Sequence, residues 1–207
     1  MHLSCDDFSQ NLSDNSSQNL SDNSSQLQES SSQIIIIFEG HDMTGKTEIA
    51  KALAKELGIP YFKNKAEYDK NYDSSAALKY QAPFTQKLLE ATGQSIIFDR
   101  SWPSELIYSQ VYERPTYKSI LSMLDDRLSR MNSIIFILEK NEEDYLEDAH
   151  SMIEVEKYNA IKQAYHNFHS TSSTETHLIN ISEFKNKDGS YNLLNELNYI
   201  FDILFST

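Results

Sequence analysis

The sequence predicts a three-layer α/β fold in which about five parallel strands are covered by helices on both faces. Short runs of β-branched and aromatic residues recur along the chain, and helical stretches separate them. Strands that alternate with helices are joined by crossover connections, and these produce a parallel sheet that is buried on both faces. A shift in composition near residue 34 marks where this pattern begins. We therefore expect one folded domain over residues 34–207.

Residues 1–33 form the other predicted unit. They are rich in Ser, Asn, Gln and Asp, and they contain the octapeptide QNLSDNSS twice in tandem, at 10–17 and 18–25. Such a tract buries too little apolar surface to offset the entropy that is lost when a chain becomes ordered. We expect residues 1–33 to be a disordered low-complexity tail.

The first predicted strand leads directly into a phosphate-binding loop. Four isoleucines and Phe38 form an apolar run at 34–38, which suits a strand buried on both faces. Gly40 follows and, after four more residues, Gly45-Lys46-Thr47, which completes the pattern G-x-x-x-x-G-K-[ST]. The next residues, TEIAKALAKEL, have a helical apolar face. This order of strand, loop and helix is the context that the motif requires.

The residue types of the loop suit a polyphosphate ligand. Glycines let the backbone approach closely, so that successive N–H groups and the helix N-terminus point at the anion. Lys46 is expected to reach the β- and γ-phosphates, and the Thr47 hydroxyl is expected to hold Mg²⁺. The predicted cofactor-binding residues are Gly40, His41, Asp42, Met43, Thr44, Gly45, Lys46 and Thr47.

The remaining elements follow in alternation. Gly58 ends the first helix, residues 59–62 form a second short strand, and a helical region interrupted by Pro83 is expected at about 74–92. Further strands are expected at three apolar runs, 95–99, 133–138 and 176–181. Further helices are expected at about 102–112, 116–131, 151–169 and 191–204. The acidic stretch 139–150 fits either a mobile lid or a solvated loop with a helix start.

The strand at 95–99 ends in a second group of functional candidates. Ligands of parallel α/β sheets bind beyond the carboxyl ends of the strands, where both the phosphate loop and Asp99 fall. Asp99 can hold Mg²⁺ through water or accept a proton, and Arg100 can bind a phosphate bidentately. Ser101 is expected to cap the next helix. The predicted catalytic residues are Lys46, Asp99 and Arg100, and the predicted metal ligands are Thr47 and Asp99.

The segments FEGHDMTGKT and DRSWPSELIYSQ resemble the thymidylate kinase family and its deoxynucleoside kinase relatives. Asp99, Arg100, Ser104 and Tyr108 match the spacing D-R-x-x-x-S-x-x-x-Y of the second motif. The resemblance implies a P-loop kinase fold and phosphoryl transfer from ATP–Mg²⁺ to a (deoxy)nucleoside monophosphate, with dTMP as the leading acceptor. It also implies that Asp42 contacts the sugar hydroxyl of the acceptor and that Arg100 binds its phosphate.

The chain departs from the thymidylate kinases in its arginines. Met43 stands at the loop position that can supply a catalytic arginine, the lid-like stretch 139–150 contains none, and Lys63 stands near the place of the arginine expected after the second strand. The residues expected to bind the acceptor are Asp42, Lys63, Tyr80, Gln81, Phe84, Arg100, Ser104, Tyr108 and Arg114. Tyr80 and Phe84 fit a core-facing stripe equally well.

Two alternative functions remain open at this point. A deoxynucleoside kinase fits the acid-Arg-Ser triplet at 99–101 and the base-reading position of Gln81; Asp99 would then deprotonate a nucleoside 5′-hydroxyl. From another class of protein, a non-catalytic module could sense ATP or GTP without any small-molecule acceptor.

Composition limits the partners and the compartment. The net charge of −13 and the pI near 4.8 argue against nucleic acid or an anionic membrane surface as a partner. The single cysteine, Cys5, forms no intrachain disulfide and fits a reducing compartment. No apolar run approaches the length of a membrane span, and no signal-peptide pattern is present. We expect a cytoplasmic enzyme with a small nucleotide or nucleoside acceptor, and a homodimer is a candidate assembly.

Overall fold

The computed structural model describes residues 33–64, 81–82, 84–88, 90, 93–146 and 154–205, and the structural statements below concern these residues. The predicted tail, apart from Gln33, lies outside the described residues. The described residues between 81 and 90 are helical, within the region where a helix interrupted by Pro83 is predicted.

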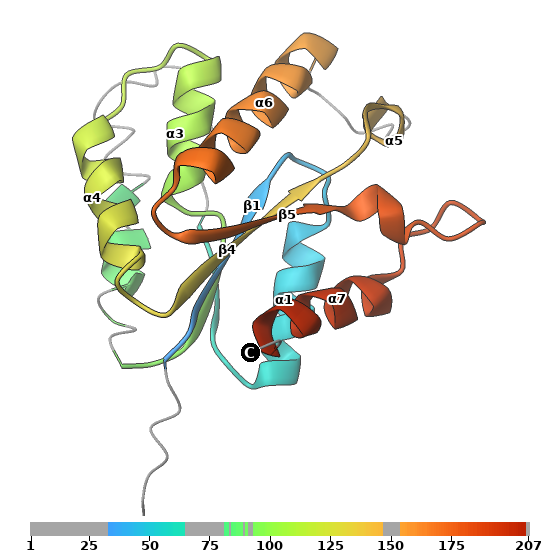
Figure 1. Cartoon of the computed structure of the whole chain (residues 1–207), viewed down its shortest axis with the longest axis horizontal. Coiled ribbons are helices and arrows are strands. Elements are labelled where there is room, and N and C mark those ends of the chain that lie inside the picture. The colour runs from blue at the N-terminus through green and yellow to red at the C-terminus, as the bar shows by residue number, and fades with distance from the viewer. Residues whose placement is uncertain are drawn as a thin grey trace, which may run out of the picture. The chain divides into compact units, whose positions relative to one another are not determined.

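A five-stranded parallel sheet in the order β2-β3-β1-β4-β5 lies at the centre of the fold (Figure 1). The strands are β1 (Ile35–Gly40), β2 (Tyr61–Lys63), β3 (Ile96–Asp99), β4 (Ser133–Glu139) and β5 (Glu175–Asn180). The prediction of about five parallel strands is confirmed. In the register of the sheet, Phe38 lies opposite Asp99 on β3 and Phe136 on β4, so the phosphate loop and Asp99 meet at one edge.

Helices cover both faces of this sheet, as predicted (Figure 1). On one face lie α1 (Lys46–Leu57) and α7 (Leu193–Phe205). On the other lie α3 (Trp102–Val111), α4 (Lys118–Leu128) and α6 (Val155–Thr171). The short helix α5 (Glu142–Leu146) lies in the acidic stretch 139–150, where a helix start was one of the two interpretations, whereas the 3₁₀ helix η1 (Ile181–Phe184) was not predicted. None of the described helices is both long and apolar enough to cross a membrane.

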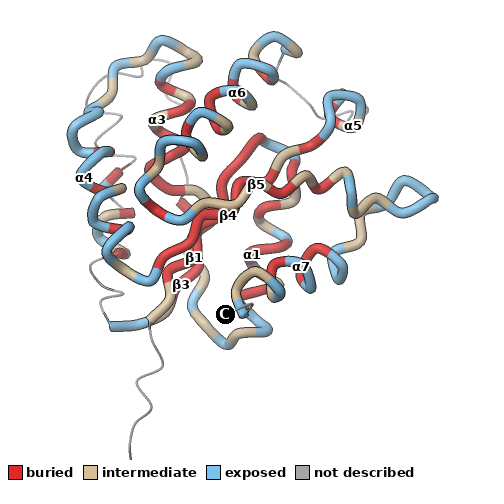
Figure 2. Tube along the Cα trace, in the orientation of Figure 1, coloured by how far each residue is buried: buried red, intermediate tan, exposed pale blue. Residues whose placement is uncertain are grey.

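The strand β1 supplies side chains to both halves of the core. Ile35 and Ile37 pack in the cluster formed with α3, α4 and α6, whereas Ile36 and Phe38 pack with α1 and α7. All four side chains are fully buried, and Figure 2 shows the same burial along the central strands. This division follows from the two-residue period of a strand, and it explains why the sequence of β1 is apolar without interruption from Ile35 to Phe38.

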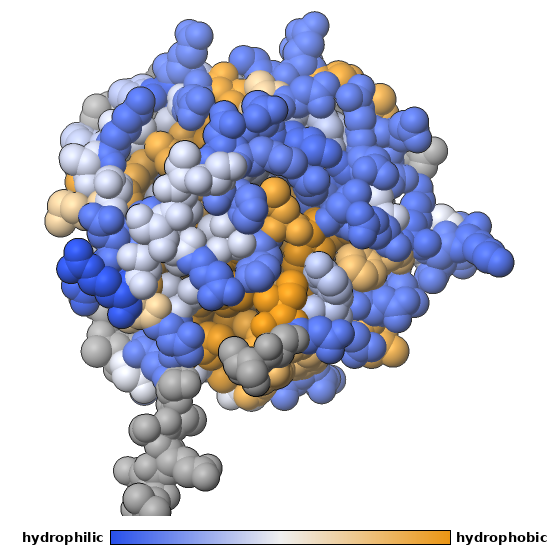
Figure 3. All heavy atoms as spheres, in the orientation of Figure 1, coloured by the Kyte–Doolittle hydropathy of each residue, from blue (hydrophilic) through white to orange (hydrophobic). Residues whose placement is uncertain are grey.

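The surface differs from this core. Figure 3 shows a face that is mostly hydrophilic, with an apolar area over the region of α7, and apolar side chains of that helix, among them Leu193, Leu194 and Phe205, are exposed.

Candidate active site

The phosphate loop leaves β1 at Gly40, where the backbone has φ +125°. A Cβ atom at this position would lie 2.0 Å from the carbonyl oxygen of Leu138 on β4. The close approach of β1 and β4 therefore admits only glycine here. Gly45, at φ +71°, then forms the N-terminal boundary of α1. Between the two glycines the backbone turns in the way that the sequence motif predicts.

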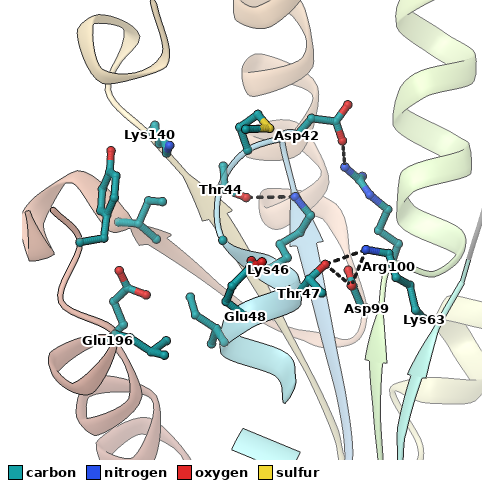
Figure 4. A pocket seen from close by; sticks show the side chains of 16 residues that line it. Asp42, Thr44, Lys46, Thr47, Glu48, Lys63, Asp99, Arg100, Lys140 and Glu196 are labelled. Atoms are coloured by element: carbon teal, nitrogen blue, oxygen red, sulfur yellow. Dashed lines mark hydrogen bonds and ion pairs between the residues drawn. The ribbon is translucent and has the colours of Figure 1, made fainter. Parts of the chain in front are cut away.

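Lys46, the first residue of α1, is buried and folds back over the loop (Figure 4). Its Nζ donates hydrogen bonds to the carbonyl oxygen of His41 and, at 3.0 Å, to Oγ1 of Thr44. Burial, and then the nearby guanidinium of Arg100, lower the pKa of Lys46 well below its usual value. A bound polyphosphate would replace these neutral acceptors with anionic ones and favour the charged ammonium.

Three donors converge on one carboxylate oxygen, Oδ2 of Asp99. Thr47 Oγ1 donates to it at 2.6 Å and the Tyr61 hydroxyl at 2.9 Å, and Lys63 Nζ lies 3.3 Å away. Burial raises the pKa of Asp99, but these hydrogen bonds and the Lys63 charge outweigh burial and lower it. Asp99 is therefore ionised at neutral pH. Burial and the bond to Asp99 raise the pKa of Tyr61, which keeps that hydroxyl a donor.

The oxygens of Thr47 and Asp99 fit a Mg²⁺ site. A hydroxyl and a carboxylate that lie next to a phosphate loop are the protein ligands that P-loop enzymes supply, and the donor phosphates complete the shell. Within the described part of the chain, no group of three His, Cys, Asp or Glu side chains could hold a metal ion without such help. When bound, Mg²⁺ neutralises charge on the transferring phosphates.

Lys63, at the end of β2, lies beside these two oxygens. Its Nζ donates to Thr47 Oγ1 at 2.7 Å (Figure 4). Because an ammonium next to both ligands repels a divalent cation, we expect Lys63→Met to tighten Mn²⁺ binding several-fold, as measured by electron paramagnetic resonance titration. Lys55→Met, which removes an exposed charge from the last turn of α1, is the matched control. Equal or weaker Mn²⁺ affinity in Lys63→Met would contradict this expectation.

Arg100 adopts a left-handed backbone conformation, with φ +68°, which costs a non-glycine residue on the order of 1 kcal/mol. Its guanidinium forms an ion pair with exposed Asp42, donates to Ser104 Oγ at 3.0 Å and lies 5.5 Å from the ring centroid of Tyr108. These contacts hold a largely buried cation beside Asp99, at a strand end where an anionic ligand can reach it.

Glu39, which was not predicted from sequence, is a fully buried carboxylate that is linked to Arg100 through the hydroxyl of Ser104. It accepts hydrogen bonds from the Ser101 backbone N–H at 2.6 Å, from the hydroxyls of Ser101 and Ser104, and from Tyr165 at 3.1 Å. Burial raises its pKa, against the charge of Arg100 and these donors. Its position in the sequence, an acid directly after the apolar run at 34–38, could have identified it as a candidate.

The prediction that Ser101 caps α3 holds for its position but not for its side chain. Ser101 is the N-cap residue, but its hydroxyl accepts no hydrogen bond from the first turn of the helix; it is directed at Glu39, to which it donates.

A stack of three aromatic rings supports the loop from the side of α5 and α6. The His41 ring stacks on Tyr158 with 4.3 Å between centroids, and Tyr158 stacks on Tyr145 at 4.1 Å. Both ring nitrogens of His41 are buried and have no hydrogen-bond partner. Burial, followed by the positive charge of Lys46, lowers the pKa of His41 to about 3. The imidazole is therefore neutral and acts as a packing group.

This neutral imidazole makes stability depend on pH. The pKa of His41 is about 3 in the folded protein, against 6.5 for an unperturbed histidine of the unfolded chain, so the unfolded chain binds the proton first as pH falls below 6.5. Stability is lost progressively between pH 6.5 and 3, by about 2 kcal/mol at pH 5. We expect His41→Phe to reduce the loss seen between urea denaturation at pH 7.5 and at pH 5, and His177→Gln to serve as control. The same loss in wild type and His41→Phe would refute this assignment.

The loop and the strand ends line one cavity of about 660 Å³, a size suited to a nucleotide. Its lining includes most of the predicted site, namely Asp42, Met43, Thr44, Gly45, Lys46, Thr47, Lys63, Asp99 and Arg100. It also includes seven residues that were not predicted: Glu48 and Ile49 in the first turn of α1, and the more distant Lys140, Ile181, Tyr191, Leu193 and Glu196. Gly40 and His41 lie behind the lining, at the base of the loop.

Other predicted acceptor-binding residues lie apart from this lining. Phe84 is fully buried in the core, with its ring 4.8 Å from that of Phe98, which is the packing alternative left open by the sequence. Gln81 is buried, and its amide has no hydrogen-bond partner. The Arg114 guanidinium lies 4.8 Å from the Tyr112 ring. Tyr80 lies outside the described residues.

Together, the fold and the site define a P-loop phosphotransferase: a phosphate loop after β1, an acid-arginine pair after β3, and a parallel sheet that brings the two together. The family model for polyphosphate kinase 2 (PPK2) matches residues 2–134. The chain therefore belongs to the PPK2 family, and it is a nucleotide or nucleoside kinase. The resemblance to thymidylate kinases predicted this class of enzyme but not this family.

Solved structures agree with the fold. The YorR protein from Bacillus subtilis, in complex with phosphorylated GDP, matches with a TM-score of 0.60 at 17% identity, over 84% of this chain and 98% of that one. Thymidylate kinase from Ehrlichia chaffeensis matches with a TM-score of 0.57 at 15% identity, over 84% of this chain and 99% of that one. Deoxyadenosine kinase from M. mycoides matches with a TM-score of 0.56 at 17% identity, over 84% of this chain and 100% of that one. No curated protein matches the chain in sequence.

Proposed function

We propose that the protein transfers the γ-phosphoryl group of ATP–Mg²⁺ to a (deoxy)nucleoside monophosphate, with dTMP as the first acceptor to test. The observation that carries this proposal is that Lys46, Thr47, Asp99 and Arg100 line a single cavity. Phosphoryl transfer needs a donor cradle, a metal site and a cation for the acceptor, all within reach of one another, and little covalent chemistry besides.

Each group has a distinct part in the proposed reaction. The loop N–H groups and Lys46 bind the β- and γ-phosphates of the donor, and Thr47 and Asp99 hold Mg²⁺. Arg100 binds the acceptor phosphate, which as a dianion is a stronger partner than the exposed Asp42 carboxylate. Asp42, once released, can accept a hydrogen bond from the sugar hydroxyl of the acceptor.

Two features indicate that the assay should include a second phosphoryl donor and a second class of phosphoryl acceptor. The name of the PPK2 family points to inorganic polyphosphate as a donor beside ATP, since a loop that grips phosphates accepts either. The buried, unpartnered amide of Gln81 favours a second candidate, a deoxynucleoside kinase, because such an amide can hydrogen-bond an acceptor base. In that reaction Asp99 would accept the proton of the 5′-hydroxyl.

The deciding experiment measures phosphorylated product for each pairing of a donor, ATP or polyphosphate, with a panel of nucleosides and nucleoside monophosphates. Turnover of monophosphates, with dTMP among the best, supports the proposal. Turnover of nucleosides alone supports the second candidate. Product formation that survives in Lys46→Ala and Asp99→Asn would show that the cavity is not the active site.

We also propose, from sequence, that residues 34–207 form the kinase domain behind a disordered tail, that the enzyme is cytoplasmic, and that it forms a homodimer. Sedimentation of the full chain and limited proteolysis test the assembly and the tail.

A further inference from the structure

The cavity has a second wall, on the side of the phosphate loop away from Asp99 and Arg100. In Figure 4, Lys140 and Glu196 lie on this side, and the loop with Lys46 lies between them and Arg100. Lys140 follows β4, and Glu196 belongs to the first turn of α7. The rest of this wall is formed by Ile181, Tyr191 and Leu193. The phosphate-transfer roles proposed above leave all five residues unused.

Glu196 is the unusual member of this wall. The residue is 4% exposed, and its Oε1 atom is buried without a hydrogen-bond partner. Burial raises the pKa of Glu196, and the charge of Lys140 opposes that effect. A buried carboxylate oxygen that lacks a hydrogen-bond donor destabilises the fold. A ligand that supplies N–H groups to this oxygen would remove that penalty.

Lys140 gives the same wall a positive pole. It is also 4% exposed, and its Nζ lies 4.7 Å from the centroid of the Tyr191 ring. The wall thus combines a hydrogen-bond acceptor, a hydrogen-bond donor and apolar or aromatic groups, which is the composition of a site for a flat heterocycle.

The two poles distinguish the purine bases. Guanine presents two neighbouring donors, N1–H and the N2 amino group, and two neighbouring acceptors, O6 and N7. Adenine presents one donor, its N6 amino group, with the acceptors N1 and N7 on either side of it. A carboxylate can accept both guanine donors while an ammonium donates to O6. A bare phosphate chain offers the carboxylate no donor at all.

We propose that this wall binds the base of a guanine nucleotide whose phosphates occupy the loop, so that GTP is preferred to ATP as phosphoryl donor. The inference rests on the proposed function in one respect, that the loop holds the donor phosphates. It goes further by naming the base and the two residues, Glu196 and Lys140, that read it.

Equilibrium binding of GTP, ATP and tripolyphosphate, measured by calorimetry without an acceptor, tests the proposal. Wild type is expected to bind GTP at least about tenfold more tightly than ATP, since a good bidentate contact discriminates by about 1–3 kcal/mol. Glu196→Ala is expected to abolish this preference by weakening the binding of GTP, while the binding of tripolyphosphate stays the same or tightens. Glu196→Gln, which keeps the volume and so guards against misfolding, is expected to lose the preference as well. Glu183→Ala, an exposed acid of the adjacent η1, is the matched control.

The outcomes separate the two proposals. The guanine site would be overturned if wild type bound GTP and ATP equally, or if both Glu196 variants lost the same affinity for all three ligands. Either result would leave the proposed role of the phosphate loop unaffected. Failure of wild type to bind any of the three ligands, or unchanged binding of all three by Lys46→Ala, would overturn the donor site itself, and the proposed function with it.

Discussion

Replacing Lys46 by methionine is expected to lower kcat/KM by about 10³-fold, which corresponds to about 4 kcal/mol of transition-state stabilisation. Lys46 is the cation that the loop itself presents to the transferring phosphate, and no other side chain of the loop carries a positive charge. Its burial and its lowered pKa add a second expectation. A methionine of similar length relieves the cost of burying an ammonium, so the melting temperature should stay the same or rise.

Steady-state kinetics and thermal denaturation of the same preparations check both expectations, with Lys55→Met as the control. A variant that keeps near-normal turnover would exclude Lys46 from the reaction. A variant that loses activity only in step with its melting temperature would give the lysine a structural role.

Asp99→Asn is expected to reduce kcat by about 10²- to 10³-fold and to raise the Mg²⁺ concentration needed for half-maximal activity. The amide oxygen can still accept the bonds that Thr47 and Tyr61 donate, so the fold is retained. The negative charge that attracts the metal is lost, however, and with it the ion pair of Lys63.

A Mg²⁺ titration of the initial rate, in wild type, Asp99→Asn and the exposed α4 control Asp126→Asn, distinguishes a metal ligand from a merely structural acid. An unchanged Mg²⁺ requirement in Asp99→Asn would remove Asp99 from the metal site.

The parts of this fold that sequence predicted well are local in the chain. The apolar run of β1, the glycines of the loop and the face of α1 are adjacent, so one motif fixed the order of strand, loop and helix. Asp99 was predictable because it ends an apolar strand, and parallel strands end at a common edge. Element boundaries differ by a few residues, because capping and end fraying depend on tertiary partners.

The parts that sequence missed are assembled from distant segments. Glu196 and Lys140 reach the cavity through the connections after β5 and β4, and no spacing rule joins them to the loop. Ser101 has the residue type of a helix cap, but Glu39, 62 residues earlier, takes its hydroxyl. The motifs at Gly40 and Asp99 are shared across P-loop kinases, which is why they predicted the class of enzyme and not the PPK2 family.

The division of β1 between two clusters has a consequence for how the molecule comes apart. Ile35 and Ile37 anchor one helical layer, and Ile36 and Phe38 anchor the other; the same strand ends in the turn that grips phosphate. Detaching this strand would dissolve both layers and the ligand cradle in a single cooperative event. Helical circular dichroism and nucleotide affinity should therefore vanish at one urea concentration, with no partly folded species that still binds.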